Sequence, residues 1–133
     1  MKKELKVGDK ASRSKIFTDN DVTQFAEVST DKNPIHLDEK YAQNTIFKQR
    51  IVHGMLVGSL FSGILGCDLP GEGTIYMGQT LSFKAPVPLN EKVTATVEVT
   101  NIRQDKPIAT FKTTCVDSKG KVVIEGEATV RVP

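Results

Sequence analysis

Asp31, Asn33 and His36 are the side chains of this sequence best suited to chemistry, and they lie close together around Pro34. A carboxylate and an imidazole can hold a water molecule between them and exchange its protons, and such general acid–base catalysis accelerates a reaction about 10²–10⁴-fold. Pro34 keeps the residue before it out of the helical region, so we expect a rigid, irregular loop. A plain turn closed by Asp31, with a structural histidine, fits the same residues.

Other catalytic signatures do not occur in the sequence. Neither Ser59 nor Ser62 has the Gly-x-Ser-x-Gly spacing of a serine hydrolase, and there is no glycine-rich phosphate loop. His36 and His53 form no metal-binding pair of the HExxH kind. We therefore expect a site that uses neither a metal nor a cofactor.

The composition limits the classes of partner and compartment. The 133 residues suit one domain over 1–133, and a formal charge of +2 from mixed signs argues against a nucleic-acid groove or a polybasic membrane patch. Cys67 and Cys115 lie far apart without a CxxC motif, which favours free thiols in a reducing cytosol. The charged start lacks the apolar run of a secretory leader, and the apolar stretch 51–66 is too short to span a bilayer. We expect a cytoplasmic protein.

The hydrophobic pattern predicts the elements that must position the loop. A capping-box spacing at Thr18 and Asp21 starts a helix before the loop, and a second short helix follows it. Period-two alternation with turn signals between the segments predicts strands in the second half of the chain. The expected strands are 10–17, 74–84, 92–103, 108–117 and 122–132, and the expected helices are 19–28, 38–44 and 51–66.

The helix expected over 51–66 is apolar on every side, so we expect other parts of the chain to enclose it. The strands that follow can do this if the sheet curls around the helix. The sequence therefore predicts an α+β fold, in which a five-stranded antiparallel sheet wraps a long central helix.

Several segments together resemble the MaoC-like family, and in particular its short, single-domain (R)-specific enoyl-CoA hydratases. The core of the resemblance is the Asp-x-Asn-Pro-x-His sequence, followed by a spaced alanine and a downstream His-Gly. The matching segments are 25–36 (FAEVSTDKNPIH), Ala42, 51–55 (IVHGM), 59–66, 69–71 and 78–84. One departure is Thr30, where the family usually has glycine; threonine is a poor occupant if the position requires a positive φ.

The resemblance implies a hot-dog fold that pairs into homodimers, with the sheets joined edge to edge. It also implies the reversible addition of water to a trans-2-enoyl-CoA, which gives the (3R)-3-hydroxyacyl-CoA of fatty acid metabolism. Asp31 and His36 would then hold the water, Asn33 would support the loop or the water, and Ser62 would orient Asp31. Which of the pair acts as the base stays open.

Two further residues have expected roles in substrate binding. Gly54, at the start of the central helix, can offer a backbone N–H to the thioester oxygen as an oxyanion hole, or it can simply let the helix start tightly. Leu65 lies on the same helix face as Ser62 and can line the acyl pocket, although Ser62 could equally bond to its own i−4 carbonyl. For His53 we expect a structural role.

Three other functions compete with the hydratase interpretation. The first is a 3-hydroxyacyl-acyl-carrier-protein dehydratase, which should favour a basic docking patch; Lys2, Lys3, Lys48 and Arg50 are candidates but do not form a clear cluster in the sequence. A hot-dog thioesterase would lack the Asp-x-Asn-Pro-x-His core. A catalytically silent acyl-thioester-binding module would be expected to have lost Asp31 or His36.

Overall fold

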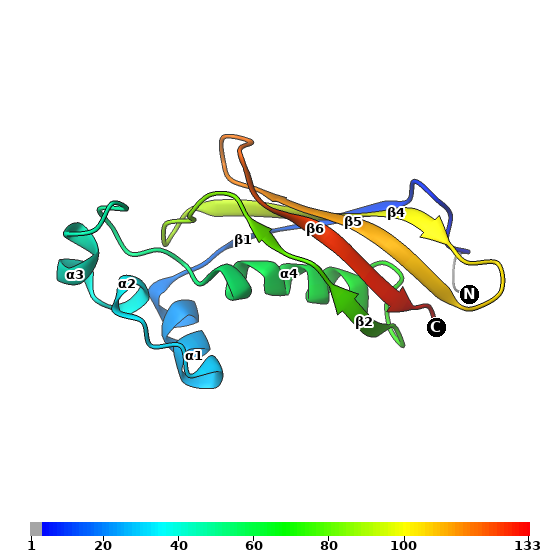
Figure 1. The fold of residues 1–133 in the computed structure, drawn as a ribbon, viewed down its shortest axis with the longest axis horizontal. Coiled ribbons are helices and arrows are strands. Elements are labelled where there is room, and N and C mark those ends of the chain that lie inside the picture. Colours follow the sequence, from blue (N-terminus) through cyan, green and yellow to red (C-terminus); the bar gives the residue numbers. More distant parts are fainter. Residues whose placement is uncertain (1–3) are drawn as a thin grey trace.

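A computed structural model describes residues 4–133 of the chain. One strand comes first, four helices follow, and five strands complete the chain (Figure 1). The elements are β1 (Lys10–Ile16), α1 (Asp19–Ser29), α2 (Pro34–Leu37), α3 (Glu39–Gln43), α4 (Gly54–Cys67), β2 (Ile75–Gln79), β3 (Ser82–Phe83), β4 (Lys92–Ile102), β5 (Ile108–Val116) and β6 (Val122–Arg131).

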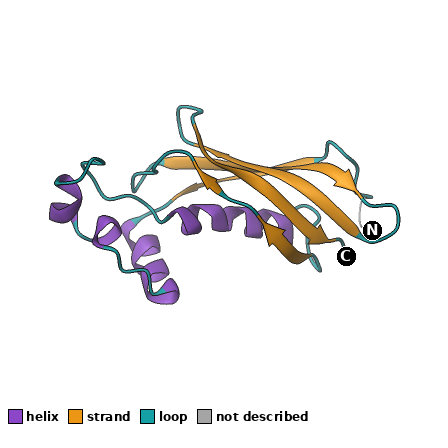
Figure 2. Cartoon of the chain, viewed as in Figure 1, coloured by secondary structure: helices purple, strands orange, loops and turns teal. Residues whose placement is uncertain are grey.

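The strands form one antiparallel sheet in the order β1-β4-β5-β6-β2, and β3 also pairs with β6. The sheet curves over α4, and the segment with α1, α2 and α3 extends beyond one end of it (Figure 2). The predicted α+β architecture is therefore confirmed. Within residues 4–133 the sheet has six strands rather than the predicted five.

The sixth strand arises because the predicted strand 74–84 is divided at Thr80. The Thr80 N–H donates to the Glu127 carbonyl at 2.9 Å, and the Thr80 hydroxyl accepts from the Glu127 N–H at 3.0 Å. This draws the chain so close to β6 that a Cβ on Gly126 would lie 1.9 Å from the Thr80 carbonyl oxygen. The glycine on β6 thus permits the interruption, which alternation within 74–84 could not show.

Helix α4 packs one face against the sheet and leaves another face uncovered in the single chain. Val57, Phe61, Ile64 and Leu65 are buried in the core, and each such side chain contributes about 1.5–3 kcal/mol. Met55, Ser59 and Ser62 are exposed. The expectation that the chain encloses this helix on all sides is therefore wrong, because the sheet covers one side only.

The segment before α4 differs from the prediction in its short helices. The capping box of α1 is present as predicted, with the Asp21 N–H donating to the Thr18 hydroxyl at 3.3 Å. An additional turn of helix, α2, begins at Pro34, a favourable first position because proline needs no helical partner for its nitrogen. Residues 51–53 are extended, so α4 starts at Gly54. No helix within residues 4–133 has the length and apolar character needed to cross a membrane.

Candidate active site

The loop that carries Asp31 begins where α1 ends, at Thr30. This residue has φ 67° and ψ 6°, the left-handed conformation that glycine adopts most readily. The position therefore does require a positive φ, and threonine occupies it at a cost of about 1–2 kcal/mol. The Ser29 hydroxyl accepts from the Asp31 N–H at 3.1 Å and fixes the next residue.

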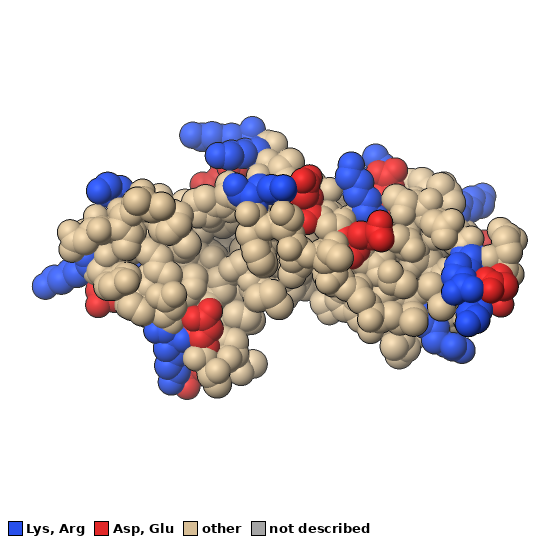
Figure 3. Space-filling view, in the orientation of Figure 1, with Lys and Arg blue, Asp and Glu red and all other residues tan. Residues whose placement is uncertain are grey.

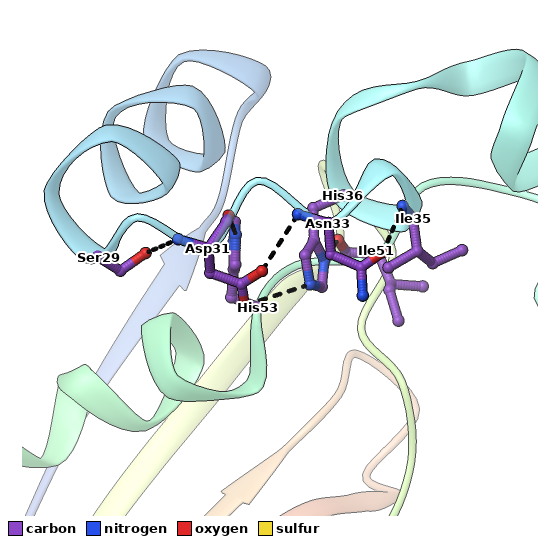
Figure 4. Close-up of polar contacts among 7 residues, drawn as sticks. All are labelled: Ser29, Asp31, Asn33, Ile35, His36, Ile51 and His53. Carbon is purple, nitrogen blue, oxygen red and sulfur yellow. Dashed lines mark hydrogen bonds and ion pairs between the residues drawn. The ribbon is translucent and has the colours of Figure 1, made fainter.

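Asp31 and Asn33 organise the loop through their own side chains. Asp31 Oδ1 accepts from the Asn33 N–H at 3.2 Å, and Asn33 Oδ1 accepts from the Ile35 N–H at 3.3 Å (Figure 4). The second bond caps α2, so Asn33 supports the loop, one of its two expected roles. With Oδ1 engaged in this way, Asp31 is left with Oδ2 to face His36.

His36 is buried, and its tautomer follows from its neighbours. Its Nδ1 lies 2.8 Å from the Ile51 carbonyl oxygen, which can only accept, so Nδ1 carries the proton and Nε2 keeps a lone pair. Burial is the main cause that lowers the pKa of His36 below the ordinary histidine value, and the neighbouring His53 lowers it further. The Ile51 carbonyl and Asp31 oppose this shift. The ring is therefore neutral at pH 7.

The free nitrogen of His36 and the carboxylate of Asp31 face each other across a short gap. Asp31 Oδ2 lies 3.9 Å from His36 Nε2 (Figure 4), too far for a direct hydrogen bond. Both atoms are acceptors when His36 is neutral, so a water placed between them donates one hydrogen to each. The separation of the two atoms therefore leaves room for one water molecule between them.

A pocket of about 430 Å³ opens beside Asp31, which is one of its lining residues. Gly54 lies in its wall as the first residue of α4, where a backbone N–H has no partner within the helix and the helix dipole is positive. A Cβ at this position would lie 2.6 Å from Cε1 of Phe83, which lines the same pocket. Other lining residues include Asp31, His53, Val57 and Ile124.

The structure does not bring Ser62 or Leu65 to this pocket. Ser62 lies eight residues beyond Gly54 on α4, about 12 Å along the helix. Within residues 4–133, no hydrogen bond joins its exposed hydroxyl to Asp31 or to the carbonyl of Gly58. Leu65 is buried in the core between α4 and the sheet.

Two further residues contact the pair. The sequence predicted a structural role for His53, and the structure places it against both Asp31 and His36. For Arg50 the sequence predicted no role at this site. Arg50 donates from Nε to the His36 carbonyl at 2.7 Å and from Nη2 to Asp19 at 2.7 Å. Nothing in the local pattern distinguishes this arginine from a surface residue.

Asp31, His36 and His53 each place a potential metal-ligand atom within 4.8 Å of the other two. Their arrangement nevertheless suits proton transfer better than metal binding. One nitrogen of each ring is committed to a backbone carbonyl. The two rings are also stacked at an interplanar angle of 27°, so the lone pair of each ring lies in its own plane of the stack.

A carboxylate and a neutral imidazole beside the N-terminus of a helix that packs under a curled antiparallel sheet define a hot-dog enzyme for acid–base chemistry. Comparison with known proteins gives the family. The MaoC like domain matches residues 3–121, and the chain belongs to the MaoC-like family.

Several proteins of known name are similar to this chain over nearly its whole length. The (R)-specific enoyl-CoA hydratase of Aeromonas caviae is 54% identical over 129 residues, which cover 97% of this chain and 96% of that protein. The solved structure of the A. caviae (R)-hydratase superposes with a TM-score of 0.96 at 53% identity, covering 97% of this chain and 98% of that one. A mitochondrial 3-hydroxyacyl-acyl-carrier-protein dehydratase of Solanum lycopersicum is 40% identical and covers 97% of this chain and 78% of that protein.

Proposed function

We propose that this protein is an (R)-specific enoyl-CoA hydratase, a hydro-lyase that interconverts trans-2-enoyl-CoA and (3R)-3-hydroxyacyl-CoA without a cofactor. The observation that carries the proposal is the 3.9 Å gap between Asp31 Oδ2 and His36 Nε2, next to a pocket with the Gly54 N–H in its wall. The A. caviae relative has the same activity by name. Both members of the pair are present, which argues against a silent binding module.

The pair activates water for addition to C3 of the substrate. Water donates one hydrogen to Asp31 and one to His36, so a lone pair of its oxygen points away from both toward the pocket. When that oxygen bonds to C3, one member of the pair takes a proton and the pair returns a proton to C2. The C2–C3 double bond becomes a single bond, and the enzyme ends with the protons it started with.

The negative charge that develops on the thioester oxygen needs a donor. The N–H of Gly54 supplies one at the positive end of α4, and losing such a donor costs about 2.7–4 kcal/mol in other enzymes. Val57 and Ile124 give the acyl chain an apolar wall. Leu65 does not line the pocket; we propose that, buried in the core eight residues beyond Val57 on α4, it stops an acyl chain that reaches past the pocket lining.

The test is hydration of crotonyl-CoA, followed as loss of the ultraviolet absorbance of the enoyl thioester, with chiral analysis of the product. We expect the (3R) product from the unmodified protein. A folded protein that hydrates no short or medium enoyl-CoA, or one that gives the (3S) product, would refute the proposal.

The acyl-carrier-protein dehydratase is the second candidate, because a 40% identical relative has that activity by name. Among the described residues, the structure adds little support for a basic docking patch. Arg50 has a side chain only 15% exposed and is bonded to Asp19 and to the His36 carbonyl. Lys2 and Lys3 lie outside the described residues, and Figure 3 shows charges of both signs interspersed on the face in view. Comparing kcat/KM for one acyl group on the two carriers decides between them.

We also propose that a single domain over 1–133 works as a cytoplasmic homodimer. Strand β2 ends the sheet and is exposed along most of its length, with Ile75 57% and Met77 55% exposed. An apolar strand edge of this kind is an aggregation hazard unless another strand covers it. Pairing would also cover the exposed face of α4, where Ser62 lies. Ser62 would then contact Asp31, as predicted, only across the interface between the two subunits. Light scattering of the purified protein tests the dimer.

A further inference from the structure

His53 is buried more deeply than any role at the helix end explains. It precedes the first residue of α4 but makes no capping hydrogen bond with its side chain. Its ring is only 2% exposed, and a buried polar ring costs free energy unless it is hydrogen-bonded. A purely structural position of this shape would suit an apolar side chain better.

One nitrogen of His53 holds the backbone of the catalytic aspartate. His53 Nε2 lies 2.9 Å from the Asp31 carbonyl oxygen. Because a carbonyl only accepts, Nε2 carries the proton and donates. This bond joins the start of α4 to a loop that is otherwise held at Asp31 by contacts within the loop itself.

The face of the His53 ring packs on the other member of the pair. The centroids of His36 and His53 lie 3.8 Å apart with an interplanar angle of 27°, and Phe25 meets the His53 ring edge-on at 4.8 Å. The stack shields His36 from water and places no charge-stabilising acceptor above it. The stack therefore favours the neutral form of His36 over the protonated form. The neutral form is required because the water must donate a hydrogen to His36 Nε2.

The other nitrogen of His53 has no protein partner. Nδ1 is a buried atom without a hydrogen bond to the described residues. Among the described residues, the ring thus makes three specific contacts: the donor bond, the stack on His36 and the edge-on contact with Phe25. Two substitutions at His53 can separate the donor bond from the stack.

We propose that His53 is a positioning residue of the hydratase, a role that rests on the function proposed above. Through Nε2 it fixes the Asp31 backbone, and through its ring it fixes His36, so the two catalytic groups stay at the separation that holds one water. His53 itself does not touch the reacting atoms.

Two variants separate the contacts. His53→Phe keeps an aromatic ring against His36 but has no donor for the Asp31 carbonyl; we expect kcat to fall on the order of 100-fold with KM little changed, because misplacement by about 1 Å has that effect. His53→Gln keeps an amide donor but not the stack; we expect most of kcat to remain and the acid limb of the pH profile to move to higher pH. Val28→Ala, one turn beyond Phe25 along α1 and 84% exposed, is the matched control and should keep the wild-type kcat.

Nitrogen NMR of the two histidines provides a readout that does not depend on activity. In the unmodified chain we expect the Nε2–H tautomer for His53 and the Nδ1–H tautomer for His36. In His53→Gln we expect the pH midpoint of the His36 titration to rise. The Nδ1–H tautomer at His53 would overturn the proposal even if neither variant folds. Wild-type kcat in folded His53→Phe, or an unchanged His36 midpoint in His53→Gln, would overturn it as well. An unmodified protein that hydrates nothing but shows the expected tautomers and midpoint shift would refute the hydratase function and leave the positioning geometry supported.

Discussion

The loop around Asp31 and the core under the sheet are held by different forces. In the loop, side-chain and backbone hydrogen bonds from Ser29, Asn33 and His53 fix an aspartate that stays 49% exposed. In the core, Phe61 and Phe111 are fully buried and held by apolar packing. Hydrogen bonds near solvent contribute little net stability but define geometry, whereas apolar burial contributes stability without directing a reactive atom. Substitutions in the two regions should therefore affect different measurements.

The largest expected effect is on activity, at the catalytic pair. Asp31→Asn keeps the acceptor that binds the Asn33 N–H, and His36→Asn keeps a donor for the Ile51 carbonyl. Each should lower kcat about 10²–10⁴-fold, because the water loses one of its two acceptors. Denaturant unfolding should show stability close to wild type. A variant that retains more than a tenth of the wild-type kcat would contradict the assignment.

The converse test is in the core. Phe61→Ala should lower the free energy of unfolding by about 3–5 kcal/mol, because it removes a fully buried ring from α4. At a temperature where the variant is folded, kcat per active site should remain near wild type. Phe83→Ala removes a ring of the same size that is 52% exposed, and its loss of stability should be far smaller. Equal losses of unfolding free energy in the two variants would show that burial does not determine how much each ring stabilises the fold.

The pH dependence tests the electrostatics of the loop. His36 must be neutral to accept from water, and burial places its pKa below the ordinary value of about 6.5. Activity should therefore stay high as pH falls to about 6.5 and then drop about tenfold per pH unit below the lowered pKa. The same shift makes folding less favourable in acid, since the unfolded chain binds this proton more readily than the folded one. A loss of kcat/KM that begins well above pH 7 would be incompatible with a buried, neutral His36.

A smaller effect is expected where the two regions meet, at Gly54. Gly54→Ala would place a Cβ 2.6 Å from Cε1 of Phe83, so the ring must swing away or the thioester loses its place beside the N–H. We expect kcat/KM to fall about tenfold, equivalent to about 1.4 kcal/mol. If crowding by the ring is the cause, adding Phe83→Ala should restore much of this loss. Failure of the double variant to recover would mean that the new methyl group blocks the substrate directly.

The smallest effect is expected at Thr30, which carries strain into the loop. Thr30→Gly should raise the free energy of unfolding by about 1 kcal/mol, because the left-handed conformation costs glycine nothing. The neighbouring Asp31 contacts remain, so kcat should change little. Thermal unfolding measures the gain, and a less stable variant would show that the flexibility of glycine in the unfolded chain outweighs the relief.

Local patterns were sufficient to predict much of the fold. Alternation identified the sheet, the Thr18 and Asp21 spacing identified the start of α1, and Pro34 identified the irregular loop that carries Asp31. These features depend on residues close together in the sequence, where backbone preference and side-chain capping act directly. The split between β2 and β3 was missed because it depends on Gly126, far along the chain from Thr80.

The sequence by itself determined the family and the α+β class, and it singled out Asp31 and His36 as the proposed acid–base residues, because their types and spacing suit that chemistry. Only the tertiary structure decided which ring nitrogen of His36 carries the proton and how far His36 lies from Asp31. It also decided that His53 and Arg50 contact this pair. Each of these depends on a contact between segments distant in sequence, such as His36 with Ile51 or His53 with Asp31. The tertiary structure also decided that the sheet covers only one face of α4, because composition shows that a helix is apolar but not how many of its sides a sheet can reach.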